Sequence, residues 1–385
     1  MEKAIIFWLD GPPLCCKGVF DATARLWKGK SYYVCTKEIN ENRAKIASET
    51  GKSDGSAEYV MLSQMENPKE SGMKFLNEHI DDIHVFNGYM SNSSVYLNEL
   101  LKINKQAKAV VWAERPCPNV LGKGALYKAL YEKIHKFRHS LYAKKLNNKI
   151  SALLPLGKQG VDAYIDLGWS SDKVFRFLYL PVMNESITPV FNEKKPEKVR
   201  FVYLGRFSAG WKGTDILLSA CRKLKNSNYT LTMVGGYGDY KEQTLEYIEQ
   251  NPNLEFGGTW KIDEACDRLS EYDVCIIPSR YEGWNVTVNE ALMAGTGCIV
   301  TDESVSSEMV SASETGIVVK AGDASSLAEA MDYVMSNTDL VNKWRKNAFD
   351  FRPNMTSEAC AEYFIEVLRY LFYGAAEKPL PPWIK

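Results

Sequence analysis

The chain has 385 residues, a length that favours two domains over one, and 45% of its residues are apolar, which is enough for buried cores. Its 47 Lys and Arg residues nearly balance 48 Asp and Glu residues, which argues against a protein that binds nucleic acid through its overall charge. Nine cysteines form no Cys-x-x-Cys pair, which indicates a reducing cytoplasm, and we expect neither a signal peptide nor a membrane-spanning segment.

Short apolar runs alternate with longer helical stretches from residue 3 onward, the pattern of a parallel, doubly wound α/β domain. The expected strands of this first half are 3–9, 31–35, 58–62, 83–86, 107–112, 149–154 and 174–178. A loop, 10–18, follows the first strand and leads into a helix. The segment 184–198 carries two prolines and a charged run without an apolar period, so we predict the interdomain linker there.

A second series of the same kind follows the linker. Its expected strands are 199–204, 229–234, 254–256, 273–277, 298–301 and 316–319, with helices between them. The sequence therefore predicts two Rossmann-like domains in tandem, 1–183 and 184–355. The last stretch, about 356–385, begins as an amphipathic helix that is free to pack back on the first domain.

The most informative stretch is 273–295, in which a buried strand, a loop and a capped helix follow one another. Asn285 is a good N-cap for a helix that ends at Gly295. Glu282 and Glu290 flank that cap, at the carboxyl end of a sheet where open α/β folds bind phosphorylated ligands. In an alternative interpretation, Thr287 and Glu290 form a capping box, and Glu282 is an ordinary loop charge.

Two glycine-containing loops belong to the same expected edge of the second sheet. The loop 205–213 begins with Gly205 and carries Arg206 and Lys212, two cations that suit a diphosphate, although isolated charges of this kind are commonly solvated. Gly235 opens a second loop, which by itself indicates only a tight turn. Neither half has the Gly-x-Gly-x-x-Gly sequence that a dehydrogenase would need.

These residues together resemble the donor half of the retaining GT-B glycosyltransferases of family 4. The similarity extends over about residues 199–335 and rests on Glu282-x₇-Glu290, on the flanking segments 277–279 and 291–295, and on the pairs 205–206 and 212–213. It implies a GT-B fold, in which two Rossmann-like domains have parallel sheets that face each other across a cleft.

The resemblance also implies roles for individual residues. Arg206 and Lys212 would bind the donor diphosphate, Glu290 the ribose and Glu282 the transferred sugar. The remaining donor-binding candidates are Gly205, Gly235 and the helix start, which comprises Trp284, Asn285, Val286 and Thr287. The spacing from Arg206 to Lys212 is one residue longer than is usual in the family. The family's Phe-Gly-Leu is replaced by 284–286, which leaves the identity of the donor sugar open.

The first half resembles the family more weakly. The loop 11–18 corresponds to the family's glycine-containing first loop, which makes Gly18 a candidate for contact with the donor phosphate. Asn87 stands where the family's His-x-His-Gly strand end has its second histidine, near the donor sugar, and His84 is expected to be a packed core histidine. Glu114 follows the strand 107–112 and would either touch the acceptor or pair on the surface.

Residues 122–149 contain eight Lys and Arg residues and a single acid, Glu132. Apolar residues recur at helical spacing in this segment, namely Leu126, Leu130, Ile134, Phe137 and Leu141. A helix of this kind either lies on an anionic membrane surface or covers the sheet with a solvated basic face. His135 and His139 share a helical face, but Lys136 stands where a zinc protease needs its Glu, so no metal site is expected.

The sequence as a whole predicts a retaining hexosyltransferase that uses a nucleotide diphosphate sugar such as a UDP-sugar. The expected acceptor is a saccharide or lipid-linked saccharide of bacterial surface polysaccharide or lipopolysaccharide biosynthesis. No metal or other cofactor is expected, and the enzyme would be cytoplasmic or peripheral on the cytoplasmic membrane face. The alternative is a GT-B protein that is not a transferase, either a sugar-nucleotide epimerase or a sugar-nucleotide-binding module.

Overall fold

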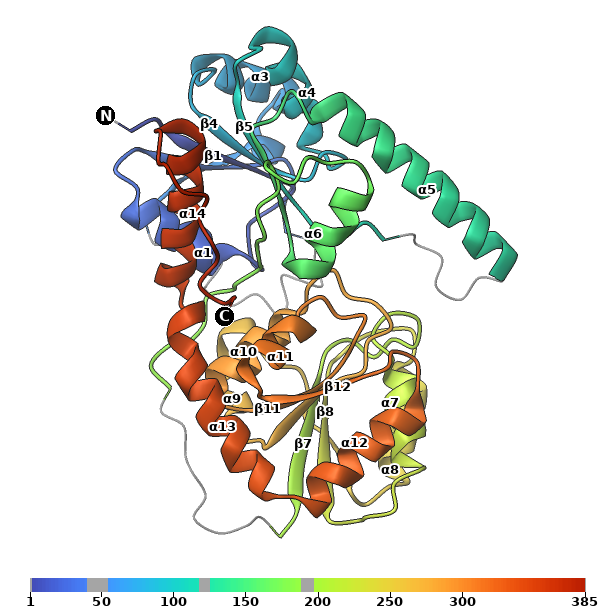
Figure 1. Cartoon of the computed structure of the whole chain (residues 1–385). Helices are drawn as coiled ribbons and strands as arrows, with labels where there is room; N and C mark the ends of the chain where they lie inside the picture. The colour runs from blue at the N-terminus through green and yellow to red at the C-terminus, as the bar shows by residue number, and fades with distance from the viewer. Residues whose placement is uncertain (1, 40–54, 118–124, 188–196, 385) are drawn as a thin grey trace. The chain divides into compact units, whose positions relative to one another are not determined.

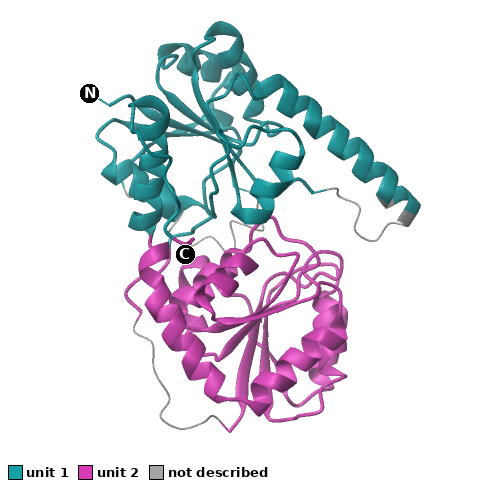
Figure 2. Ribbon diagram, viewed as in Figure 1, with its two compact units in different colours: residues 1–182, 357–382 teal, residues 183–356, 383–385 magenta. Residues whose placement is uncertain are grey.

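The structure is a computed structural model that describes residues 2–39, 55–117, 125–187 and 197–384 (Figure 1). It divides into two compact units (Figure 2). One comprises Met1–Val182 and Ser357–Pro382, and the other comprises Met183–Thr356 and Trp383–Lys385. Most of the predicted linker, 184–198, lies outside the described residues.

The first unit is built on a parallel sheet whose six described strands have the order β3-β2-β1-β4-β5-β6. The strands are β1 (Ile5–Leu9), β2 (Ser31–Cys35), β3 (Glu58–Met61), β4 (Ile83–Asn87), β5 (Lys108–Ala113) and β6 (Ala152–Pro155). The order reverses between β1 and β4, which pair directly from Ile5 opposite Ile83 to Trp8 opposite Phe86. In open α/β sheets this reversal is the place where ligands bind, beyond the carboxyl ends of the strands.

Helices pack on both faces of this sheet because successive side chains of a strand point to opposite faces. On one face Phe7 stacks on Phe20 with ring centroids 4.3 Å apart, and Phe364 lies 6.3 Å from Phe7. On the other face Trp8 stacks on Tyr96 at 4.6 Å. The helical elements of this unit are α1 (Lys17–Leu26), η2 (Leu62–Gln64), α3 (Pro68–Glu78), α4 (Ser94–Ile103), α5 (Ala125–Leu146), α6 (Gly157–Asp166) and α14 (Ser357–Phe372).

The strand predicted at 174–178 is wrong, although every other predicted strand overlaps a strand of the structure. This segment makes only two isolated bridges beside β6, Leu153 with Val174 and Leu156 with Phe177. Pro155 lies between the two bridges and has no N–H, so it cannot donate the hydrogen bond that would continue the ladder. The segment is therefore extended but is not a seventh strand of the sheet.

The second unit repeats the plan with the strand order β12-β11-β10-β7-β8-β9, again parallel. Its strands are β7 (Val199–Leu204), β8 (Tyr229–Val234), β9 (Leu254–Phe256), β10 (Val274–Ile277), β11 (Gly297–Thr301) and β12 (Gly316–Val319). Its helices are α7 (Thr214–Cys221), α8 (Lys241–Glu249), α9 (Ile262–Leu269), α10 (Val286–Ala294), α11 (Ser307–Ser313), α12 (Ala324–Ser336), α13 (Asp339–Phe351) and η3 (Arg352–Met355). The strand order reverses between β7 and β10, so the loops that follow these two strands meet at one edge.

The helix α10 starts at this edge and is almost entirely buried. All its residues from Thr287 to Ala294 are buried, which fits the six apolar residues among its nine. Asn285 is the N-cap, and Gly295 ends the helix with a φ of 77°, a left-handed conformation that glycine adopts without strain. The predicted cap and stop are thus both confirmed.

Candidate functional site

The candidate site of the second unit lies at the carboxyl ends of β7 and β10. Lys212, in the loop after β7, is joined to Glu282, in the loop after β10, by an ion pair of 2.5 Å between Nζ and Oε1. The Ser279 hydroxyl donates to the same Oε1 at 2.9 Å. Both side chains of the ion pair are largely buried, at 24% and 13% exposure, so the two charges attract each other more strongly than they would in water.

A second ion pair holds the same two loops together, and sequence reasoning missed it. Arg280 makes a bidentate pair with Asp215 at the start of α7, with N–O distances of 2.6 and 2.7 Å, and its backbone N–H donates to Trp211 O at 2.8 Å. Asp215 precedes Arg280 by 65 residues, so no local spacing indicates the pair. Its effect is to fix the loop that carries Lys212.

Gly213 allows the two loops to approach closely. Its φ is 64°, and a Cβ built on it would lie 2.0 Å from Pro278 O, where no side chain fits. The glycine in the Lys212-Gly213 pair therefore has a steric role in the structure, which is to seat the loop after β7 against the end of β10.

The start of α10 faces the same edge. The side chain of Asn285 accepts a hydrogen bond from Thr287 N at 3.0 Å, and Asn285 N donates to the Ser306 hydroxyl at 3.4 Å. Trp284 is buried and donates its indole N–H to Asn289 Oδ1 at 2.9 Å. Val286, the first helical residue, is half-buried. The N-terminus of α10, with its positive dipole end, thus begins four residues after Glu282 and favours an anion there.

Glu290 is buried at 5% exposure inside α10. Burial raises the pKa of its carboxyl to about 7, and a hydrogen bond with the Thr287 side chain partly offsets that shift. The capping-box interpretation is wrong, because the N-cap is Asn285 and Glu290 is the fifth helical residue rather than the third. Its carboxyl is a buried acid that requires another explanation.

The remaining candidates of this unit differ in their surroundings. Arg206 is exposed, and its guanidinium makes no ion pair within the described part of the chain, while its carbonyl accepts from the Tyr203 hydroxyl at 2.7 Å. Gly205 and Gly235 are brought together, since a Cβ on Gly235 would lie 2.1 Å from Gly205 O. The structure therefore places a free cation and two close-packed glycine loops beside the Lys212–Glu282 pair.

The candidates of the first unit are at the carboxyl edge of its own sheet. Asn87 ends β4 and lines a hollow of about 490 Å³, together with the loop after β1 and with Glu114. Gly18 lies inside α1, where its N–H donates to Leu180 O at 3.1 Å and its Cα packs against the backbone of Pro181. The amide of Gly18 thus already has a partner within the protein, in contrast to the amide of a free phosphate-binding loop.

His84 is a packed core histidine, as expected from its place in β4. It is fully buried, it accepts from Trp8 Nε1 at 3.0 Å, and its Nε2 lies 3.0 Å from His79 O. These contacts assign the proton to Nε2. Burial lowers the pKa of His84 to about 4, so it is neutral at physiological pH.

The exposure of the apolar row on α5 contradicts one of the two interpretations of the basic segment 122–149. If α5 covered the sheet, its apolar row would be buried, but five side chains of the row are 50–87% exposed, namely Leu126, Leu130, Ile134, Phe137 and Leu141. Figure 1 shows the amino-terminal half of α5 extending away from the body of the first unit. An apolar row that no described element covers therefore lies beside basic residues. No described helix is both long enough and apolar enough to cross a membrane.

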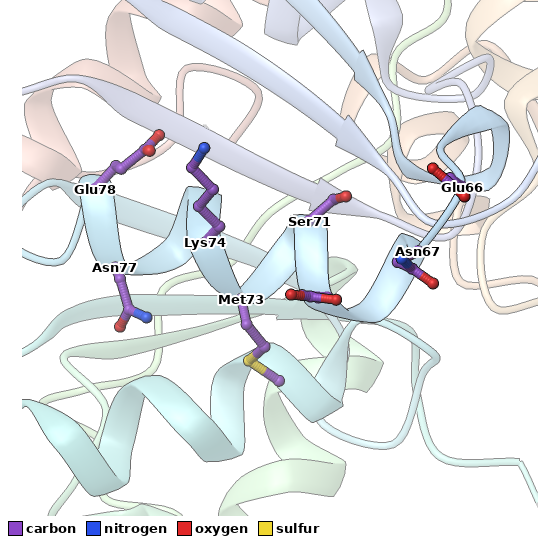
Figure 3. A pocket seen from close by; sticks show the side chains of 8 residues that line it. Glu66, Asn67, Ser71, Met73, Lys74, Asn77 and Glu78 are labelled. Carbon is purple, nitrogen blue, oxygen red and sulfur yellow. The ribbon is translucent and has the colours of Figure 1, made fainter.

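Two other features of the structure bear on ligand chemistry. No cluster of three or more metal-binding side chains occurs within residues 2–39, 55–117, 125–187 and 197–384. A shallow hollow of about 750 Å³ runs along α3 and is lined only by residues between Glu66 and Glu78 (Figure 3). It contains no strand end and no loop of the candidate sites.

Comparisons with known proteins agree with this geometry. Residues 185–351 match the family model described as glycosyl transferases group 1. The chain is 29% identical over 172 residues to an uncharacterized 41.2 kDa protein in the cps region of Klebsiella pneumoniae, a match that covers 45% of this chain and 43% of that protein. The chain spans less than half the length of the curated relatives that it matches.

Solved structures resemble the whole fold. The structure of Anabaena Alr3699/HepE in complex with UDP and glucose has a TM-score of 0.71 at 14% identity, covering 96% of this chain and 100% of that chain. WaaG, a glycosyltransferase involved in lipopolysaccharide biosynthesis, has a TM-score of 0.62 at 14% identity, with 96% and 100% coverage. The chain therefore shares the GT-B fold of these solved structures, and residues 185–351 match the model of the glycosyl transferases group 1 family.

Proposed function

We propose that the protein is a retaining glycosyltransferase that moves a hexosyl group from a nucleotide diphosphate sugar, with UDP as the nucleotide, to a saccharide or lipid-linked saccharide. One observation carries the proposal. The Lys212–Glu282 pair lies at the strand-order reversal of the second sheet, on one loop that also carries exposed Arg206 and on another that leads into α10.

Each group has a part in binding the donor. Arg206 and Lys212 neutralise the diphosphate, and the dipole of α10 adds to their effect. Glu282 accepts hydrogen bonds from hydroxyl groups of the transferred sugar, and Glu290 does the same for the ribose. Because Lys212 already contacts Glu282, donor binding would place the cation between the sugar-binding carboxylate and the phosphate.

The transfer step needs charge stabilisation rather than a protein nucleophile. The acceptor hydroxyl oxygen forms a bond to the anomeric carbon on the face from which the diphosphate departs. The bond from that carbon to the β-phosphate oxygen breaks, its electron pair stays on the phosphate, and the hydroxyl proton passes to that oxygen. Arg206, Lys212 and the α10 N-terminus stabilise the developing negative charge, and we propose that no metal ion is needed.

The comparisons support a role in bacterial surface polysaccharide or lipopolysaccharide assembly. The Klebsiella relative belongs to a cps region, and WaaG acts in lipopolysaccharide biosynthesis. For such an enzyme we propose peripheral attachment to the cytoplasmic membrane face through α5. Its exposed apolar row would enter the interface, and its Lys and Arg residues would contact anionic lipid headgroups.

Incubation of the full chain with a panel of nucleotide sugars, with nucleotide release followed over time, tests the transferase. We expect release with at least one UDP-sugar, unchanged by EDTA, and we expect Glu282→Gln to reduce it about 100-fold or more. Glu271→Gln is the matched control, because Glu271 is an exposed acid just before β10, at the other end of the strand from Glu282. Retention is read from the anomeric configuration of the product.

Three results would refute parts of the proposal. If no nucleotide sugar is bound or consumed, the transferase assignment fails. A change of the sugar at one of its stereocentres without transfer would instead identify an epimerase, and binding without turnover would identify a binding module.

A further inference from the structure

Two histidines of α5 face each other across one turn of the helix. The Nε2 atoms of His135 and His139 are 3.3 Å apart, and the centroids of their rings are separated by 4.3 Å. Residues four positions apart lie on the same face of a helix, which brings the two imidazoles together. Each ring therefore presents a nitrogen atom to the same point in space.

The separation of the two Nε2 atoms fits two ligands of one metal ion. Zinc–nitrogen bonds are about 2.0–2.1 Å long, so two such nitrogens in tetrahedral coordination lie about 3.3–3.4 Å apart. A direct hydrogen bond between the rings would be a long one at 3.3 Å. The spacing therefore suits a shared ion better than a shared proton.

Tyr89 supports the ring of His139 in this orientation. The Tyr89 hydroxyl contacts His139 Nδ1, and its ring meets the imidazole edge-on with centroids 5.7 Å apart. Both side chains are buried. A metal ion at Nε2 requires the proton of His139 on Nδ1, where the Tyr89 oxygen is placed to accept it. Metal-binding histidines commonly have such a hydrogen-bond partner behind the ligand atom.

The pair is open to a hollow of about 310 Å³, through which an ion can reach it. His135 and His139 both line this hollow, together with Glu114 and Tyr179, and His135 is only half-buried. Within the described chain no third His, Cys, Asp or Glu completes a metal-binding cluster with the pair. Water would therefore fill the remaining coordination positions, and the hollow has room for it.

The charge state of the two rings also favours a metal ion. Burial lowers the pKa of His139 to about 4, and burial together with the charge of Arg138 lowers the pKa of His135. Both imidazoles are accordingly neutral at physiological pH, the form that binds metals. Arg138 is exposed and donates to Met90 Sδ at 3.5 Å. Its positive charge opposes a bound cation, so we expect a moderate affinity.

We propose that His135 and His139 form a binding site for a divalent transition-metal ion, held by both Nε2 atoms and completed by water. Imidazole ligands suit Zn²⁺, Ni²⁺ and Cu²⁺, whereas Mg²⁺ and Ca²⁺ prefer oxygen ligands. Lys136 takes the place of the general base that a zinc protease needs, which excludes that catalysis and leaves both imidazoles able to bind an ion.

The ion would have a structural role and is independent of the transfer reaction proposed above. It would join two successive turns near the middle of α5, beside the amino-terminal half that extends away from the first unit (Figure 1). A bond from each turn to the same ion holds the helical conformation there, because the ligands are arranged correctly only in a helix.

NMR of the histidine side chains tests the site directly, because the chain has only four histidines. The full chain is purified without a histidine tag, its imidazoles are labelled with ¹⁵N, and Ni²⁺ is added. We expect paramagnetic broadening of the His135 and His139 signals before any change at His79. His79 is the internal control, since its Nδ1 lies 2.8 Å from an Asp82 carboxylate oxygen in another part of the unit. Mg²⁺ should leave all four signals unchanged.

Calorimetric titration of the same protein with Ni²⁺ and with Zn²⁺ measures the affinity. His135→Ala removes one of the two ligands at a half-buried position, so we expect binding to weaken about tenfold or more. His79→Ala is the matched control and should change nothing. Arg138→Gln should tighten binding about threefold, because a positive charge near the ion is removed. Lys144→Gln, an exposed lysine of the same helix, is the control for that charge.

Three results would overturn the inference. One is a wild-type protein that binds neither metal, and another is a His135→Ala protein that binds as tightly as wild type, which would place the ion on other groups such as cysteine thiols. The third is broadening of His79 that is as strong as that of His135. If His135→Ala does not fold, Arg138→Gln decides in its place, since an unchanged affinity in that exposed variant would contradict the location.

Discussion

Lys212 Nζ and Glu282 Oε1 are 2.5 Å apart, which joins the loop after β7 to the loop after β10 across the strand-order reversal of the second sheet. The two residues are 70 positions apart in the sequence, so no local pattern brings them together. The pair is a consequence of topology, and under the proposed function it marks the place of the donor sugar and its diphosphate.

Replacement of Lys212 by Met tests the cation directly. We expect the affinity for UDP to fall about tenfold, because a charge-assisted contact to the diphosphate is lost while the aliphatic part of the side chain is kept. Isothermal titration calorimetry measures the change. Lys223→Met, an exposed lysine of the same unit, is the matched control, and equal UDP affinity in the two variants would contradict the assigned role.

Glu290→Gln separates stability from binding. Burial raises the pKa of Glu290 from 4.5 to about 7. Between these two pH values the carboxyl is protonated in the folded protein and ionised in the unfolded chain. Stability therefore falls as pH rises through this window, by roughly 3 kcal/mol in total, and stays low above it. We expect Glu290→Gln to be as stable as wild type at pH 5 and more stable at pH 8, with weaker UDP binding.

Urea unfolding at the two pH values and UDP titration at pH 8 check this prediction. Asn285→Ala gives the contrasting result, because loss of the helix cap costs about 1 kcal/mol at both pH values. A Glu290→Gln protein that loses stability at pH 8 and keeps its UDP affinity would show that the carboxylate serves the helix alone.

Gly213→Ala tests the seating of the two loops. A left-handed φ costs alanine about 1 kcal/mol, and the contact of 2.0 Å with Pro278 O forces the backbone to move. We expect a loss of at least about 2 kcal/mol in unfolding free energy and a loss of nucleotide release. Gly210→Ala is the control, since no atom lies within 4 Å of its Cβ position; comparable destabilisation of both variants would refute the steric role.

The apolar row of α5 predicts membrane binding that is independent of folding. Leu130 and Phe137 are 60% and 66% exposed, so their double replacement by Ser should leave the melting temperature nearly unchanged. Sedimentation with phosphatidylglycerol vesicles should show at least about a tenfold loss of binding. Tyr333→Ser, at 52% exposure in the other unit, is the control, and undiminished sedimentation of the double variant would exclude α5 as the attachment site.

Local patterns in the sequence predicted the strands well because each strand carries its own apolar run. The exception at 174–178 has the same composition, and it fails because Pro155 in a neighbouring segment interrupts the hydrogen-bond ladder. The prediction of Asn285 as an N-cap also depended only on neighbouring residues. Its side chain bonds Thr287 two residues later, within the reach of sequence reasoning.

Contacts between distant segments were beyond that reach. The Arg280–Asp215 pair depends on the meeting of β7 and β10, and the hollow around Glu114 depends on Tyr179 and on α5. For α5 itself, the apolar spacing was compatible with two environments, and only the tertiary structure shows that the row is exposed. Patterns within one element predict that element, whereas the site is formed where elements meet.

The position of α14 also bears on how the protein is made. Tyr363 donates to Arg176 O at 2.9 Å, and Phe364 lies 6.5 Å from Phe20, so the last long helix completes the core of the unit that begins the chain. During synthesis, Phe7 and Phe20 emerge from the ribosome more than 300 residues before α14, the helix that packs on them. A nascent chain therefore carries an exposed aromatic surface while the second unit, which is continuous in sequence through Thr356, can already fold. Assembly of the first unit is the step at which a chaperone would be needed.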